Sequence, residues 1–279
     1  MKSLSAEIVF LLHNGAVFKV LKLSSLVSVL LLLYLLLSVA QAADIGLSPP
    51  RLELSGMPGE TITETIIILG DATTEQQIQI RKADWTLKPD GELVILPEGS
   101  SSESASSWIQ PEVEELALVG DGGQEFRISV TIPEDTSLAG TYHSLLFFTV
   151  VPPPSEETGI AVVTTTEIGM AVYVTVKETE ENASELLDFF QEDDRSVLLT
   201  ILNEGNTLMR LGGRLELRNE AGETKYFIEV PDVPVLRESE RDLKLVIPEE
   251  VESGFYVALA MVEDSRGNLL VGELPLEIP

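Results

Sequence analysis

The residues that could carry catalytic chemistry are few, and a Ser-His pair is the first to consider. Apart from His13, the only histidine is His143, and Ser144 follows it directly. Neighbouring residues of a β-strand point to opposite faces of the sheet. This hydroxyl and this imidazole therefore cannot form the hydrogen bond that nucleophilic catalysis requires. We interpret His143 as a structural residue, either on the surface of a sheet or half-buried in it.

Metal and cofactor sites also have little support in the sequence. The chain has no cysteine, and one histidine remains after residue 42, which excludes sites built from nitrogen and sulfur ligands. Three acidic clusters lack the loop spacing of a calcium motif, and no glycine-rich loop could hold a phosphate. The clusters are Glu112-Glu114-Glu115, Glu178-Glu180-Glu181 and Asp193-Asp194. We expect no catalytic residue, metal or cofactor, and an enzyme with a carboxylate pair stays open as an alternative.

The charge of the chain excludes two classes of partner. The net charge is −28, and residues 1–42 carry three Lys and one Glu, so the remainder has a net charge of −30. Nucleic acids and anionic lipid surfaces both require a basic footprint. We therefore expect neither nucleic acid nor a membrane surface as a partner.

The first 42 residues have the composition of a secretory signal peptide. Lys19 and Lys22 precede an apolar run over residues 23–39, and Ala40-Gln41-Ala42 follows it. A basic flank, an apolar core and a small-x-small ending are typical of a cleaved signal. The alternative is a retained membrane anchor, although a run of 17 residues is slightly short of a comfortable span. The expected location is the periplasm, where the absence of cysteine means that no disulfide stabilises the fold.

A repeated phrase indicates the fold of the rest. Residues 126–142 and 241–256 each read as an alternating strand, then Ile-Pro-Glu, a short acidic loop, and Gly-x-Tyr at the start of a new strand. Pro ends a strand and Gly permits the turn. A Tyr at such a corner can bury its ring and bond its hydroxyl to nearby backbone, as in immunoglobulin-like sandwiches. The two copies predict two sandwich domains of one plan.

Short strands with turn signals every 8 to 12 residues extend this pattern along the chain. We predict an all-β protein with two immunoglobulin-like sandwiches in tandem. The expected organisation is a signal peptide at 1–42, a first domain at 43–177, an acidic linker at 178–185 and a second domain at 186–279. A strand is expected over residues 45–54, and Pro49-Pro50 interrupts it. This strand is expected either to lie at the edge of a sheet or to switch course at the prolines. The Ser-rich stretch 99–107 is expected to be a mobile loop, and Asp121-Gly122-Gly123 a hairpin turn.

One segment of the first domain could bind a protein through its backbone. Residues 160–164 read Ile-Ala-Val-Val-Thr and follow the Pro-rich loop 152–159. A β-branched strand of this kind can add to the sheet of another protein if its edge is exposed. An ordinary interior strand is the alternative.

These residues together resemble the PapD-like periplasmic pilus chaperones. The resemblance covers the first domain, where residues 45–52 (Ile-Gly-Leu-Ser-Pro-Pro-Arg-Leu) look like the first strand of that family with its switch and its arginine. Residues 140–148 and the Pro-rich loop look like its F strand and the loop to its G strand. The layout of two sandwiches also matches, while the second domain resembles bacterial surface immunoglobulin-like modules in general.

The resemblance implies a mechanism and a set of binding residues. In that family a chaperone strand completes the sandwich of a pilin subunit and covers its apolar groove. The equivalent donor residues here would be Ile160, Val162 and Thr164. An Arg and a Lys of the family bind the C-terminal carboxylate of the subunit, and the Arg matches Arg51. The implied partners are a secreted or pilin-like subunit and an outer-membrane usher.

The chain departs from the family at the expected lysine. Residues 150–176 contain no basic residue, and Glu167 stands near the expected position. A carboxylate there would repel the C-terminal carboxylate of a subunit. Arg51 then has two open interpretations, either as a ligand for a subunit or as a partner of Glu167 that holds the two domains together.

The sequence thus favours a non-enzymatic, exported protein that acts as a chaperone for a secreted or fimbrial subunit by strand donation from its first domain. A structural or adhesive protein of the cell envelope on the same scaffold is the alternative.

Overall fold

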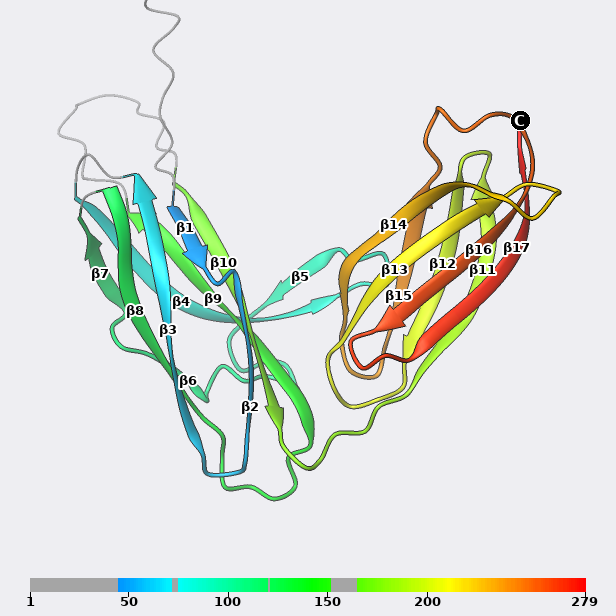
Figure 1. Cartoon of the computed structure of the whole chain (residues 1–279). Coiled ribbons are helices and arrows are strands. Elements are labelled where there is room, and N and C mark those ends of the chain that lie inside the picture. The colour runs from blue at the N-terminus through cyan, green and yellow to red at the C-terminus, as the bar shows by residue number, and fades with distance from the viewer. Residues whose placement is uncertain (1–44, 72–74, 120, 152–164) are drawn as a thin grey trace, which may run out of the picture. The chain divides into compact units, whose positions relative to one another are not determined.

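The fold consists of β-strands alone within the part of the chain that the structure describes. The computed structural model describes residues 45–71, 75–119, 121–151 and 165–279 (Figure 1). The expected signal peptide and residues 160–164 lie outside these ranges. Residues 43–279 form one compact unit. No helix among the described residues is long and apolar enough to cross a membrane.

The first ten strands form one sandwich of two facing sheets. One sheet has the order β1-β3-β8-β6, and the other has the order β2-β10-β9-β4-β5, with β7 paired to β4. The strands are β1 (Ile45–Ser48), β2 (Arg51–Gly56), β3 (Thr61–Asp71), β4 (Gln76–Leu87), β5 (Leu93–Leu96), β6 (Ile109–Pro111), β7 (Glu115–Leu118), β8 (Asp121–Thr131), β9 (Gly140–Val151) and β10 (Glu167–Val176).

The last seven strands form a second sandwich with sheets β11-β12-β15 and β14-β13-β16-β17. The strands are β11 (Ser184–Asp193), β12 (Ser196–Asn203), β13 (Met209–Arg218), β14 (Thr224–Val235), β15 (Ser239–Val246), β16 (Gly254–Asp264) and β17 (Leu269–Ile278). The predicted all-β class with two tandem sandwiches is confirmed.

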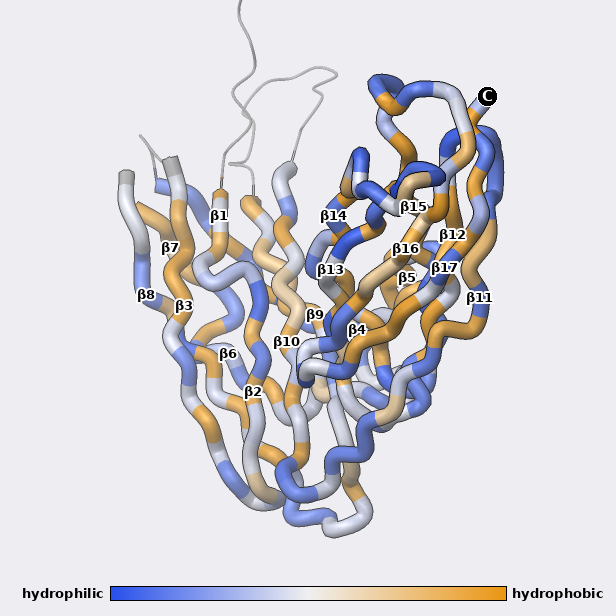
Figure 2. The backbone as a smooth tube through the Cα atoms, turned by 45° about the vertical axis from the view of Figure 1, so that its right-hand side comes forward, coloured by the Kyte–Doolittle hydropathy of each residue, from blue (hydrophilic) through white to orange (hydrophobic). Residues whose placement is uncertain are grey.

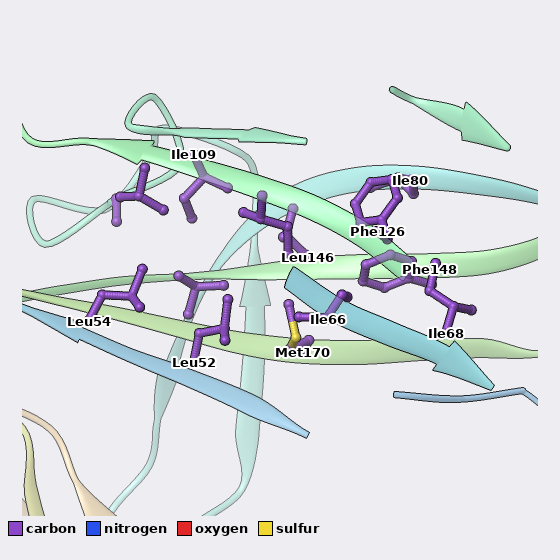
Figure 3. Close-up of a cluster of buried hydrophobic side chains, with 14 of the residues drawn as sticks. Leu52, Leu54, Ile66, Ile68, Ile80, Ile109, Phe126, Leu146, Phe148 and Met170 are labelled. Atoms are coloured by element: carbon purple, nitrogen blue, oxygen red, sulfur yellow. The ribbon is translucent and has the colours of Figure 1, made fainter. Parts of the chain in front are cut away.

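Alternation of apolar and polar residues explains both cores. Figure 2 shows hydrophilic and hydrophobic residues interspersed along the strands, and β2 has alternating exposed and buried residues over its whole length. The inward side chains of the first sandwich meet in one cluster, with Phe126 and Phe148 edge to face at 5.8 Å between ring centroids (Figure 3). Burying such side chains contributes roughly 1.5–3 kcal/mol each, which offsets the absence of disulfides.

The predicted switch at Pro49-Pro50 is confirmed. β1 pairs antiparallel with β3 in one sheet, and β2 pairs parallel with β10 in the other. Proline lacks the N–H that a continuous ladder requires, so the chain leaves the first sheet here and enters the second.

The Ser-rich stretch 99–107 makes hydrogen bonds to a buried carboxylate of the first sandwich. Asp84 is fully buried and accepts hydrogen bonds from the Ser104 hydroxyl at 2.6 Å and the Ser101 N–H at 3.0 Å. The Ser144 hydroxyl lies 3.1 Å from the same carboxylate. A buried carboxylate must be satisfied in this way, so the serines serve as its donors. The predicted mobility of this loop stays a prediction, and its bonds to Asp84 could not be predicted because this carboxylate is remote in sequence.

The repeated Gly-x-Tyr corners have different surroundings. The Tyr256 hydroxyl donates to the Glu252 carbonyl at 3.0 Å, which confirms the predicted corner in the second sandwich. The Tyr142 ring packs on Trp108 instead, with ring centroids 4.6 Å apart.

The predicted turn at residues 121–123 is wrong, because these residues begin β8 and pair with the end of β3.

The first corner also contacts the second sandwich. Thr141 N–H donates to the Asn206 carbonyl at 2.9 Å, and Leu208 N–H donates to the Thr141 hydroxyl at 3.0 Å. Gly140 has φ +76°, and a Cβ there would lie 1.9 Å from the Asn206 carbonyl oxygen. Only glycine therefore permits this approach. An apolar cluster that includes Trp85, Phe147 and Leu236 also joins the two sandwiches.

We predict that Gly140→Ala destabilises the protein more than Gly99→Ala does. Both glycines have positive φ, at +76° and +71°, but nothing lies within 4 Å of a Cβ at Gly99. The backbone strain of about 1 kcal/mol is therefore common to both variants. Gly140→Ala adds the clash with Asn206, so its loss in free energy of unfolding by urea should be roughly twice as large. Equal losses would contradict the close approach.

We predict that His143 makes the stability of the folded protein depend on pH. Burial lowers the pKa of His143 below its usual 6.5, although the Trp85 carbonyl, Glu103 and Asp84 act in the opposite direction. The unfolded chain therefore takes up a proton at a higher pH than the folded protein. The free energy of unfolding should fall as pH decreases below 6.5, by at most about 1.4 kcal/mol for each pH unit.

Urea unfolding between pH 7.5 and 5 measures this slope in the original protein and in His143→Gln. The variant keeps a donor for the Trp85 carbonyl but cannot titrate, so its slope should be smaller. The same slope in both proteins would show that His143 is not responsible.

Candidate partner-binding site

The candidate site begins with strand β10, which has a partner along only part of one side. β9 pairs with β10 along its whole length, from Glu167 to Val176. On the other side β2 pairs with β10 only from Ala171 onward (Figure 1). Within the described residues, the stretch Glu167–Met170 has no ladder partner on that side. Pro50, which precedes β2, has no N–H that could extend the ladder.

Backbone hydrogen bonds show which groups face the open side. Val150 N–H donates to the Thr166 carbonyl at 2.9 Å, so even-numbered residues of this stretch bond toward β9. Lys177 N–H donates to the Gly56 carbonyl at 2.9 Å, so odd-numbered residues bond toward the side of β2. The N–H and C=O groups of Glu167 and Gly169 therefore face the open side, where another strand could pair with them.

Several other edges of the two sandwiches are blocked against added strands. Edge strand β14 contains Pro231 and Pro234, and β17 contains Pro275. On β15, the Pro89 carbonyl already accepts the N–H of Asp242 at 2.8 Å. Prolines and capped N–H groups are common protections of sheet edges. The open part of β10 has no proline, and its side chains include the half-buried Ile168.

Glu167 does not pair with Arg51, which corrects one interpretation of the sequence. Arg81 on β4 donates to the Glu167 carboxylate at 2.7 and 3.2 Å, and the Thr149 hydroxyl donates at 2.7 Å. The Arg81 guanidinium also stacks 3.9 Å from the centroid of the Phe147 ring. The hydrogen bonds from Arg81 are the largest cause of the lowered pKa of Glu167. The pairing of β4 with β9 brings this arginine to the sheet face.

Arg51 is paired instead with two other carboxylates. Its Nε lies 2.8 Å from Glu53 Oε1, and its Nη2 lies 3.2 Å from Asp232 Oδ2 on β14 of the second sandwich. The Arg51 side chain is 41% exposed and the Asp232 side chain is 53% exposed. Ion pairs this exposed contribute about 0–1 kcal/mol, so a structural link through Arg51 adds little stability.

A second arginine, Arg210 on β13, stands beside Arg51. Its Nε and Nη2 bond both oxygens of Asp232 at 2.6 and 2.8 Å. Its Nη1 lies 3.5 Å from the same Glu53 oxygen that Arg51 contacts. The side chain is only 14% exposed. Burial raises the pKa of the neighbouring Tyr173 to about 12, which keeps that phenol neutral. Arg210 thus places a second cation beside Arg51, whereas β10 itself contains no basic side chain.

Sequence reasoning missed Arg210 and Asp232. Both are ordinary charged residues in alternating strands, and they reach Arg51 only because the two sandwiches contact each other.

The predicted donor residues stay predictions, because Ile160, Val162 and Thr164 lie outside the described residues.

His143 and Ser144, the residues considered for catalysis, bond to other groups of the protein and not to each other through their side chains. The His143 imidazole Nε2 lies 3.0 Å from the Trp85 carbonyl, while Ser144 faces Asp84 on the opposite side of the strand. Across residues 45–71, 75–119, 121–151 and 165–279, no three His, Asp or Glu side chains are grouped so that they could hold a metal ion.

No protein-family model and no curated protein sequence matches the chain. Among solved structures, a Salmonella enterica SafA pilin in complex with the SafB chaperone matches with a TM-score of 0.47 and 11% identity, over 85% of this chain and 99% of that chain. A chaperone–tip adhesin complex of CFA/I fimbriae has a TM-score of 0.47 and 9% identity, over 84% and 99% of the two chains. The E. coli chaperone DraB has a TM-score of 0.45 and 12% identity, over 86% and 98%. Each of the three solved structures contains a chaperone.

Proposed function

We propose that this protein is a periplasmic chaperone that binds a secreted or fimbrial subunit by strand pairing at the open edge of β10. The observation that supports the proposal is the half-covered β10, whose Glu167 and Gly169 backbone groups face a side of the sheet where no described strand pairs with them. A strand of the subunit that paired there would satisfy these groups and would continue the sheet.

Donation from the segment ahead of β10 extends this pairing. Ile160, Val162 and Thr164 have the same parity as Ile168 and Met170, which pack toward the core of the first sandwich. In the proposed complex these alternate side chains enter the apolar groove of the subunit, and the intervening residues do not. Such shielding prevents aggregation of an incomplete sandwich.

Arg51 is the proposed anchor for the C-terminal carboxylate of the subunit. A guanidinium binds a carboxylate through two parallel, charge-assisted hydrogen bonds. Arg210 stands next to Arg51 and takes the role for which the resemblance implies a lysine. A cavity of about 420 Å³ lined in part by both arginines gives the chain end space to approach.

The donor segment predicts different effects for two neighbouring substitutions. Val162→Asp places a charge among the donated side chains and should abolish binding of the subunit, whereas Val163→Asp has the opposite parity and should retain most of it. Affinity purification from the native cell envelope, with quantitative mass spectrometry, measures the amount of the co-purified subunit. The proposal fails if no protein co-purifies stoichiometrically, or if both variants lose it equally.

Arg51→Ala separates anchoring from structural linkage. Because the Arg51 ion pairs are exposed, we expect the melting temperature to change by no more than about 2 °C. Subunit binding measured on the same protein should decrease at least tenfold. A large drop in melting temperature with unchanged binding would mean that Arg51 only holds the sandwiches together.

A further inference from the structure

The carboxylate of Asp232 has the two arginines that a bound carboxylate would need. Arg210 bonds both of its oxygens, at 2.6 and 2.8 Å, and Arg51 bonds Oδ2 at 3.2 Å. Two guanidinium groups that converge on one carboxylate form a complete recognition site for that group. In this structure the site is therefore filled by a side chain of the protein itself.

The charge balance around the arginines reinforces this occupancy. Glu53 contacts Arg51 at 2.8 Å and Arg210 at 3.5 Å, so two cations face two carboxylates. A third carboxylate would find no net positive charge unless one of the two acids moved away. The hydrogen bonds from Arg210 are the largest cause of the lowered pKa of Asp232, so this acid stays ionised at neutral pH.

Asp232 is better placed to move than the arginine that holds it. Its side chain is 53% exposed, whereas that of Arg210 is 14% exposed. The cavity of about 420 Å³ lies beside this pair and is also lined by Gly212 and Gly213. Nothing lies within 4 Å of a Cβ at Gly212, so this wall of the cavity is open. A chain end can therefore approach the arginines while Asp232 turns toward solvent.

We propose that Asp232 is an internal competitor that occupies the carboxylate site between Arg51 and Arg210 until the C-terminal carboxylate of a bound protein displaces it. This inference rests on the proposed function, since it concerns the same anchoring site. Competition of this kind weakens the binding of any carboxylate. Only a partner that also pairs with β10 would then bind well, because its chain end is held near the site.

The test uses a fluorescein-labelled Val-Thr-Val-Thr-Val peptide with a free C-terminal carboxylate, measured by fluorescence anisotropy. Asp232→Asn should bind this peptide at least tenfold more tightly than the original protein, because both arginines become available. The C-terminal amide of the same peptide should bind Asp232→Asn and the original protein with equal affinity. Adding Arg51→Ala to Asp232→Asn should remove the gain.

Glu229→Gln is the matched control, because Glu229 is an exposed acid on the same strand β14. It removes one negative charge away from the two arginines and should leave peptide binding unchanged. Equal affinity of Asp232→Asn and the original protein would overturn the inference. So would an equal gain for the amide, or for an amide peptide with an internal Asp, because the site would then not recognise a chain end.

Failure of this inference can be distinguished from failure of the proposed function. If Asp232→Asn gains no affinity while Val162→Asp still loses the subunit and Val163→Asp keeps it, the chaperone function stands and the competition does not. If Asp232→Asn gains affinity while the two valine variants behave alike, the carboxylate site stands and strand donation does not. Thermal unfolding of Asp232→Asn shows that the variant is folded.

Discussion

The partial pairing of β2 with β10 is the constraint on which the rest of the account depends. The chain leaves its first sheet at Pro49-Pro50 and joins β10 only from Arg51 onward. A strand without this break could have covered β10 along its whole length. Among the described residues, the break instead leaves the Glu167 and Gly169 backbone groups without a ladder partner on one side, and it places Arg51 at the first residue of the new pairing. The change of sheet at Pro49-Pro50 thus accounts for both the open edge of β10 and the position of Arg51, the proposed anchor.

The contact between the two sandwiches places the remaining parts of the site. The Gly140 corner, the apolar cluster around Trp85 and the bonds of Asn206 bring β13 and β14 to the outer face of the first sandwich. Arg210 and Asp232 reach Arg51 through this contact. The interface gains its stability mainly from buried apolar area, because the exposed ion pairs add little. Loss of the exposed Arg51 ion pairs should therefore leave the fold intact.

Much of the fold could be predicted from the sequence, because alternation and turn residues are local signals. The switch at Pro49-Pro50 and the long strand β9 are examples in which a proline or an apolar run marks the element directly. The contacts of the Ser-rich loop could not be predicted, since they are made to Asp84, a residue remote in sequence. One of the two interpretations of Arg51, a pair with Glu167, was wrong for the same reason. A match to a family position suggested Glu167, whereas Arg81 binds that carboxylate through the pairing of β4 with β9.

Amide hydrogen exchange at β10 tests whether Glu167 and Gly169 form an open edge that a subunit strand pairs with. In the free protein the Gly169 amide should exchange rapidly, because it faces the open side, and the Met170 amide should be protected by its bond toward β9. Adding the purified subunit should slow exchange at Gly169 by at least tenfold and leave Met170 unchanged. Slow exchange at Gly169 in the free protein, or no added protection in the complex, would contradict the account.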